Sequence, residues 1–530
     1  MSSTGAQRPT TSLSLSALGR PTILVTVGGI AGQVFALVRT LYVANRVGTS
    51  ASLDALLVAE VFPVVVAGII VSGLRNAMVP AYLDVIANRG RDEGSRFVGF
   101  VVTWSAIVAT AAVFCLFAFS GAAVGVAGMG LAAPAREESI GFLPILAPIL
   151  ALTVVWILLT TVCQAEQKFV PIAIGLVLNP LASLVVTVGV WNDWTLRGLA
   201  AGMTIGYVAT VLFMIGYLLV SGLRVKLALT FHRSDVIRFL RHAAPLVAGA
   251  SVVQFNLLAD RATASILVAG SVSALNYGQL VVTQAIGSLS TAWMLVLYPS
   301  LVRLAKPSGA ALGEGTSRAM RMTIALFTPL VVATAALAPL GVQVAYERGA
   351  FNAQATATTA SVVAAFAPMI LLMMLQPVLT GAHNARRRGN LIGLTAVLNA
   401  VLNVVLDVVL GLNLGVAGIA LSTTITLTVV AAILVLELRR LEPGFELRPV
   451  LSTARTSLLA SLVPGIPIAC FVWLWLPRQS FLVSSALLAA LIVAGAVAYL
   501  AVGLALGLEE LRSACRTFVS QMSRRWAPSR

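Results

Sequence analysis

The sequence predicts an all-α polytopic membrane protein with about 14 transmembrane helices. Two observations lead to this prediction. The 530 residues are 59% hydrophobic and 10% charged, with a mean hydropathy of +0.97, a balance that a soluble domain does not tolerate. Apolar runs of about 20 residues, long enough to cross a hydrocarbon core of roughly 30 Å, also recur along the whole chain.

The predicted spans are separated by short polar or basic loops. They lie near residues 22–44, 53–79, 97–120, 139–163, 169–191, 198–221, 243–268, 273–301, 319–345, 356–382, 389–411, 415–436, 456–477 and 481–507. The residues before the first span are polar and basic and lack the apolar core of a cleaved secretory signal. They are therefore predicted to form a disordered cytoplasmic tail.

The basic residues test these spans independently, because the positive-inside rule places Lys and Arg in cytoplasmic loops. With the N-terminus inside, the inner loops and the two tails hold most of the basic residues. The outer loops hold only Arg46, Arg136, Arg197, Arg348 and Arg478. Both termini are therefore predicted to be cytoplasmic. The net charge of +16 reflects this topology rather than nucleic-acid binding, since no basic region of the sequence has interleaved aromatic residues.

A polar stripe that occurs twice divides the chain into two halves. Asn399, Asn403 and Asp407 are spaced four residues apart and share one face of an apolar helix. The same spacing recurs in the first half at Asn179, Ser183 and Thr187. Both copies run in the same direction, which indicates two pseudo-symmetric six-helix lobes related by a parallel repeat, with two extra C-terminal helices.

This repeat predicts the domain organisation. The predicted parts are a tail at 1–21, an N-lobe with spans 1–6 at 22–222, a basic cytoplasmic linker at 223–242, a C-lobe with spans 7–12 at 243–440, spans 13 and 14 at 441–508, and a basic cytoplasmic tail at 509–530.

A carboxylate near the middle of a bilayer is costly and marks a functional site by default. Asp407 lies in span 11 and Asp260 in span 7. Two such carboxylates cannot both ionise in a low dielectric unless a cation or a proton lies between them. Asn403 and Thr423 would add amide and hydroxyl oxygens, which together with carboxylates are the ligands of hard cations. These four residues form a candidate Na⁺ or H⁺ site, although Arg261 could instead neutralise one carboxylate as a structural ion pair.

Four other charged positions are candidates for binding an anionic substrate: Arg39, Asp54, Arg75 and Arg261. Arg39 is either an interfacial arginine that extends outward or an anion-binding arginine in a cleft. Asp54 is either its partner or the N-cap of span 2. Arg75 lies near the inner end of span 2, where the alternative is a positive-inside anchor.

The sequence contains no recognisable catalytic constellation. His232, His242 and His383 lie in predicted inner loops without a Cys or a carboxylate at ligand spacing. No phosphate-binding loop or nucleophile elbow occurs either. The chain is therefore predicted not to be an enzyme and to need no cofactor, apart from Na⁺ as a coupling ion.

Three stretches of the sequence are distinctive: LVRTLYVANRVGTSASLDALLVAEVFP, NLLADRATASILVAGSVSALNYG and YERGAFNAQATATTA. They resemble the MurJ/MviN family of lipid II flippases. The resemblance implies a bacterial inner-membrane protein that moves a polyprenyl-pyrophosphate-linked sugar to the outer leaflet by alternating access. It implies a groove for the lipid tail at the two extra helices, and leaves cell-wall synthesis or division proteins as candidate partners.

The resemblance also assigns roles to individual residues. Arg39 and Asp54 match the family's cavity arginine and its span 2 aspartate. Asp260, Asn403, Asp407 and Thr423 match a sodium site found in some members, to which Ile419 contributes a backbone carbonyl.

The chain departs from the family in its cavity arginines. Gln33, the Val66-Ala67-Gly68 stretch and Gln279 stand where the family has arginines, and Thr283 stands where it has a glutamate. A pyrophosphate prefers several charge-assisted donors. Three functions therefore stay open: a lipid II-like flippase coupled to Na⁺ or membrane potential, a flippase for another lipid-linked glycan, and a non-transporting membrane scaffold for cell-wall synthesis.

Overall fold

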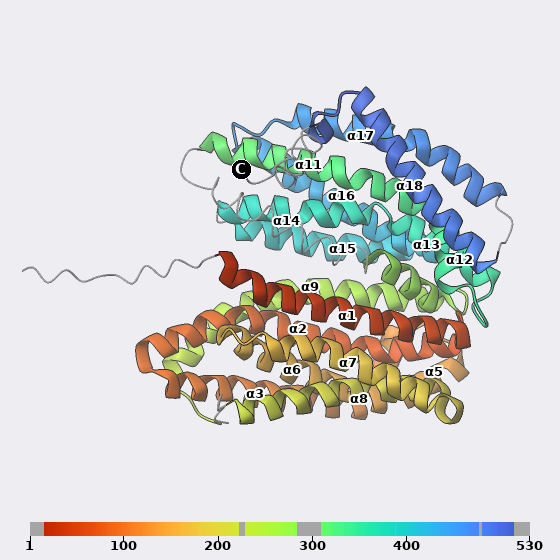
Figure 1. Cartoon of the computed structure of the whole chain (residues 1–530). Coiled ribbons are helices and arrows are strands. Elements are labelled where there is room, and N and C mark those ends of the chain that lie inside the picture. The colour runs from red at the N-terminus through yellow and green to blue at the C-terminus, as the bar shows by residue number, and fades with distance from the viewer. Residues whose placement is uncertain (1–14, 222–227, 284–308, 387, 476–479, 513–530) are drawn as a thin grey trace, which may run out of the picture. The chain divides into compact units, whose positions relative to one another are not determined.

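The computed structural model describes residues 15–221, 228–283, 309–386, 388–475 and 480–512, which contain helices and connecting turns but no strand (Figure 1). The helices are α1 (Leu15–Val47), α2 (Ala51–Arg89), α3 (Arg91–Ala118), α4 (Ser120–Ala127), α5 (Ala133–Leu146), α6 (Pro148–Ala165), α7 (Val170–Gly189), α8 (Trp191–Val220), α9 (Arg233–Ile266), α11 (Gly309–Ala336), α12 (Ala338–Tyr346), α13 (Ala353–Phe366), α14 (Met369–Ala385), α15 (Gly389–Leu414), α16 (Val416–Leu441), α17 (Leu447–Cys470) and α18 (Phe481–Ala505). A π-helical turn, η1 (Phe471–Trp475), follows α17.

The all-helical membrane fold is confirmed. Within the described ranges, twelve helical segments are long and apolar enough to cross a membrane, and they correspond to twelve of the predicted spans. The predicted span near 243–268 lies in α9, which is not among the twelve, and the span near 273–301 lies largely outside the described residues. The count of about 14 spans therefore stays a prediction.

The chain divides into two compact units. The first comprises Met1–Thr40, Ala67–Phe117 and Pro144–Val247, and the second comprises Leu41–Val66, Ala118–Leu143 and Ala248–Arg530. This division follows contacts rather than the order of the spans, so the boundaries of the predicted lobes, tails and linker stay predictions. The tail at 1–21 and the tail at 509–530 lie mostly outside the described residues.

In the first unit, small residues bring helices close together. α7 packs against α6 and α8. Gly175 of α7 lies against the Trp156 ring of α6, and Gly206 of α8 lies against the backbone of Asn179. Gly28 of α1 also lies against Ala173 of α7. Helix association in a bilayer depends on such close packing, because lipid tails are as apolar as the side chains that they contact.

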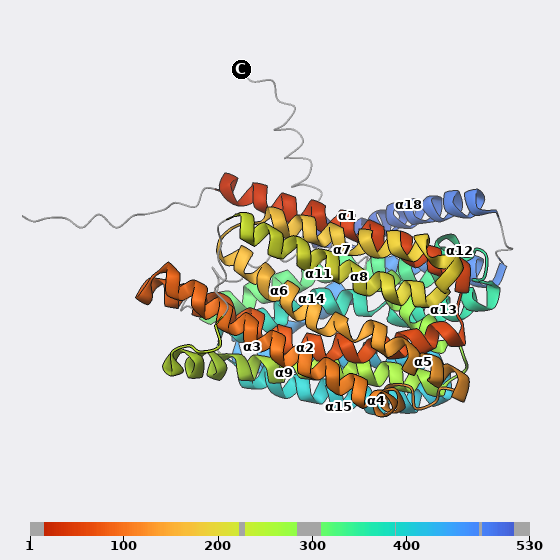
Figure 2. The same cartoon turned by 90° about the horizontal axis from the view of Figure 1, so that it is seen from below.

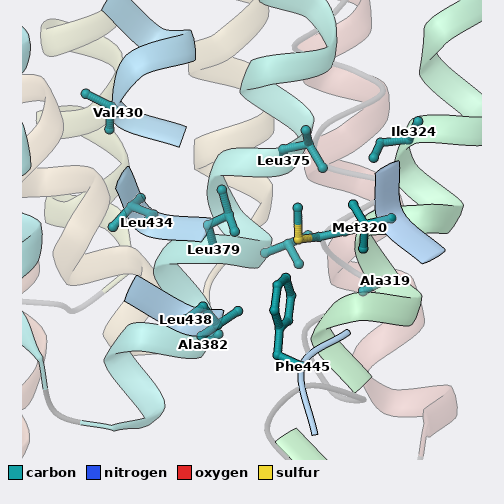
Figure 3. Close-up of a cluster of buried hydrophobic side chains, with 12 residues drawn as sticks. Ala319, Met320, Ile324, Leu375, Leu379, Ala382, Val430, Leu434, Leu438 and Phe445 are labelled. Atoms are coloured by element: carbon teal, nitrogen blue, oxygen red, sulfur yellow. The ribbon is translucent and has the colours of Figure 1, made fainter. Parts of the chain in front are cut away.

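In the second unit, α16 packs against both α14 and α15 (Figure 1). Figure 2 shows α14 and α15 from below. Near one end of α14 and α16, a buried apolar cluster joins them to α11 and α17 (Figure 3). It includes Met320, Leu379, Leu434 and Phe445. At the same end, Arg386 donates two hydrogen bonds, of 2.6 and 2.7 Å, to the carboxylate of Glu442. This end of the helices is therefore fixed by both apolar packing and an ion pair.

Candidate functional site

The helix α15 buries most of its polar stripe and exposes many of its apolar residues. Its buried residues are Thr395, Asn403, Asp407 and Gly411. These positions differ by four or eight residues and so follow one face of the helix. The valines between them, such as Val405, are exposed, as expected for a helix that faces lipid. The sequence thus directs the polar face of α15 into the protein.

Asp407 belongs to a buried polar cluster formed by α9, α15 and α16. Its carboxyl group lies within hydrogen-bonding reach of that of Asp260, and its Oδ1 accepts a hydrogen bond from Ser422. Asn403 Nδ2 approaches the same Oδ1 at 3.5 Å and the Thr423 hydroxyl at 3.4 Å. The Asp407 side chain is fully buried, and Asp260 is only 7% exposed. The structure therefore brings together the four side chains of the predicted cation site.

The backbone carbonyl of Ile419 also belongs to this cluster. It accepts hydrogen bonds from the hydroxyls of Ser422, at 2.9 Å, and Thr423, at 3.5 Å. Ser422, whose hydroxyl donates to Asp407, was not predicted from the sequence. Ser422 and Thr423 are neighbours on α16, so their side chains point about 100° apart, and the sequence does not give the rotation of α16 about its axis.

Three oxygen atoms of the cluster are buried without a hydrogen-bond partner among the described residues: Asp260 Oδ1, Asn403 Oδ1 and Asp407 Oδ2. A buried polar atom without a partner is costly. Two carboxylates, an amide, hydroxyls and a carbonyl form an oxygen-rich donor set of the kind that a hard monovalent cation prefers. In the described part of the chain no group of three or more His, Cys, Asp and Glu residues could hold a metal ion. Because its donors are all oxygen atoms, the cluster fits a hard cation better than a transition metal.

Asp54 caps another helix of the same unit. Its two carboxylate oxygens accept hydrogen bonds from the backbone N–H groups of Gly270, at 2.6 Å, and Ser273, at 2.7 Å. These groups lie at the start of the helical segment 271–283, where N–H groups lack partners within the helix. Gly270 has φ of +93°, a conformation that favours glycine. Asp54 is 3% exposed, so in this structure its carboxylate caps the start of that segment.

Arg261 also forms hydrogen bonds with the helical segment 271–283. Its guanidinium donates to the carbonyl of Val272, at 3.0 Å, and to Asn276 Oδ1, at 2.6 Å. Arg261 and Asp260 are adjacent on α9 and therefore face different neighbours. Substrate binding by Asp54 and Arg261 stays a prediction.

Arg39 lies in the first unit, on α1. Its guanidinium donates a hydrogen bond of 2.6 Å to the hydroxyl of Ser183 on α7. Ser183 is the middle residue of the polar stripe in the first half and is fully buried, whereas Arg39 is partly exposed. The last residue of that stripe, Thr187, donates to the carbonyl of Ser183, at 2.7 Å. The stripe therefore orients the partly exposed guanidinium.

Arg75 is exposed on α2 in the first unit. Arg39 and Arg75 belong to the first unit, and Asp54 and Arg261 belong to the second. The structure thus joins Asp54 and Arg261 through the segment 271–283, whereas the grouping of all four residues around one substrate stays a prediction.

Comparison with known proteins gives consistent matches. A sequence model described as lipid II flippase MurJ matches residues 43–503. A probable lipid II flippase MurJ of Synechocystis sp. is 26% identical over 381 residues, which cover 69% of this chain and 71% of that protein. A probable lipid II flippase MurJ of Thermotoga maritima is 25% identical over 431 residues, which cover 81% of this chain and 86% of that protein.

Solved structures show the same fold. A lipid II flippase MurJ in an inward closed conformation matches with a TM-score of 0.74 and 18% identity, covering 89% of this chain and 98% of that one. An inward-facing multidrug resistance MATE transporter of the MOP superfamily matches with a TM-score of 0.62 and 14% identity. The match covers 80% of this chain and 96% of that one.

Replacing Asp54 with Ala tests the capping geometry. We expect amide hydrogen exchange at Gly270 and Ser273 to accelerate by about 10- to 100-fold, because each N–H loses a charged acceptor that contributes roughly 1.5–3 kcal/mol. Peptide-resolved exchange followed by mass spectrometry measures this. Asp193→Ala, at an exposed position, is the control. Unchanged exchange across 270–273 in Asp54→Ala would contradict the cap.

Proposed function

Because the chain belongs to the lipid II flippase MurJ family, we propose that it moves a polyprenyl-pyrophosphate-linked cell-wall precursor, similar to lipid II, from the inner to the outer leaflet. The observation that carries this proposal is the family match over residues 43–503, which include ten of the twelve candidate spans in full, the end of the first and most of the last. The chain is a multi-pass protein of the bacterial inner membrane. We further propose that both termini are cytoplasmic and that transport occurs by alternating access.

Arg39 is the proposed contact for the pyrophosphate. Its hydrogen bond to Ser183 fixes the orientation of the guanidinium, and a planar guanidinium suits the oxygens of a phosphate group. Ser183 is in turn fixed by burial. The structure thus supplies a preorganised arginine on a helix rather than on a loop, which lowers the cost of ordering the side chain on binding.

A second candidate substrate is another lipid-linked glycan. Gln33 and Gln279 are neutral at positions where the resemblance leads one to expect arginines. A headgroup with fewer negative charges would need fewer charge-assisted donors. Both candidates use the same fold and the same arginine, and they differ in which lipid-linked intermediate accumulates when the protein is depleted.

The cluster around Asp407 is the proposed site of the coupling ion, Na⁺. The support comes from the buried oxygens without partners in Asp260, Asn403 and Asp407. A bound cation would compensate the charge of the two neighbouring carboxylates and provide a partner for these oxygens. Thr423 and the carbonyl of Ile419 would complete the set of ligands. The alternative occupant is a proton shared by the two carboxylates.

Sodium should stabilise the protein, and Asp407→Asn should abolish this effect. A ligand at 100 times its Kd stabilises the folded state by about 2.7 kcal/mol, and Asn cannot replace the carboxylate charge. The measurement compares thermal unfolding of the purified protein in NaCl and in choline chloride at equal ionic strength. Asp193→Asn, at an exposed position, should retain the response. A sodium effect that persists in Asp407→Asn would refute the site, and a response to pH but not to sodium would favour the proton.

Replacing Arg39 with Ala should strongly reduce transport. The loss of charge-assisted hydrogen bonds worth roughly 1.5–3 kcal/mol should lower transport by about 10- to 100-fold. Complementation of a flippase-depleted bacterial strain measures this, with membrane levels of the variant checked by immunoblotting. Arg46→Ala, at an exposed position on the same helix, is the matched control. Full complementation by Arg39→Ala would exclude Arg39 as the substrate contact.

A further inference from the structure

A cavity of about 430 Å³ lies inside the second unit, between α9, α14, α15 and α16. Two residues of the proposed sodium site, Asp260 and Thr423, form part of its wall. The cavity has room for on the order of ten water molecules. Because Asp260 and Thr423 line the cavity, it reaches the proposed site from within the same unit.

The lining of this cavity suits a cation. Among the described residues that line it, Asp260 alone carries a charge. The other polar residues are neutral and include Gln254, Asn256, Gln279, Gln376 and Asn399. A single carboxylate in a low-dielectric wall attracts cations and disfavours anions. Carboxamide oxygens can replace water in the hydration shell of a hard cation.

The cavity extends from the proposed site in one direction. Along α16 it runs from Thr423 to Leu434, a distance of roughly 16 Å at 1.5 Å per residue. Along α9 it runs from Asp260 back to Gln254. Along α16 this direction leads to the end of the helix at Leu441, and along α9 it leads to the start of the helix at Arg233. The positive-inside rule predicts both helix ends to be cytoplasmic.

An asparagine pair lies in this wall one helical turn from the proposed site. Asn256 and Asn399 precede Asp260 and Asn403, respectively, by four residues, or about 6 Å along each helix. Asn256 Nδ2 donates a hydrogen bond of 2.6 Å to Asn399 Oδ1. Asn256 Oδ1 is buried and has no hydrogen-bond partner within the described ranges.

We propose that Asn256 and Asn399 form a relay site for a monovalent cation between the cavity and the carboxylates. An ion that enters the cavity exchanges part of its hydration shell for the two amide oxygens. It then moves one turn along α9 and α15 to Asp260, Asn403 and Asp407. This inference rests on the proposed sodium site. The competing interpretation is that the pair only joins the two helices through its hydrogen bond.

The relay and the helix-joining interpretations differ in kinetics. The test measures binding of ²²Na⁺ to the purified full-length protein in nanodiscs and its release into unlabelled NaCl. Asn256→Leu and Asn399→Leu should slow both binding and release by about tenfold, because the ion loses its intermediate ligands. The equilibrium Kd should change by less than about threefold, since the carboxylate site remains. Asn413→Leu, at an exposed position on α15, should exchange sodium at the wild-type rate.

A second variant covers the case in which the leucine variants do not fold. Asn256→Asp keeps the size of the side chain and adds a charge to the cavity, so it should bind ²²Na⁺ about tenfold faster. Wild-type exchange rates in Asn256→Asp, or in folded leucine variants whose only change is lower thermal stability, would overturn the relay. A wild-type protein that binds no ²²Na⁺ would instead refute the sodium site itself, and the relay with it.

Discussion

The buried pair of carboxylates, Asp260 and Asp407, is the constraint on which the second unit depends. The two side chains lie within hydrogen-bonding reach of each other and are almost completely buried. Two negative charges at such a distance in a low dielectric repel each other strongly. Hydroxyl and amide donors of Ser422 and Asn403 reach Asp407 Oδ1, but Asp407 Oδ2 and Asp260 Oδ1 stay without partners in the described structure. A bound cation relieves both the repulsion and the missing contacts, which is why the proposed function includes one.

The two polar stripes share an arrangement but differ in charge. In the first half, Arg39 of α1 reaches the stripe of α7 at Ser183. In the second half, Asp260 of α9 reaches the stripe of α15 at Asp407. The first arrangement thus contains a permanent positive charge, whereas the second contains two carboxylates. In the proposed function, the first binds the anionic headgroup and the second binds an exchangeable cation.

Helical spacing made much of the candidate site predictable. Asn403 and Asp407 are four residues apart, so the sequence alone places them on one face, and the structure buries that face. Twelve of the predicted spans likewise coincide with helices, because a bilayer of fixed thickness demands a long apolar run. Ser422 was missed because the rotation of α16 depends on packing rather than on spacing. The cap of segment 271–283 by Asp54 was not among the options that the sequence offered, a partner for Arg39 or the N-cap of span 2, because it depends on backbone groups at Gly270 and Ser273, far along the chain.

In the proposed function, a sodium ion at the carboxylate pair drives movement of a lipid-linked glycan. Its most direct test is a leaflet-resolved assay of lipid II movement by the purified protein in sealed vesicles, with the sodium gradient and the membrane potential set independently. At a fixed potential, the rate should rise with the imposed sodium gradient and fall when that gradient is reversed. Equal rates in sodium, potassium and choline salts at the same potential would contradict it.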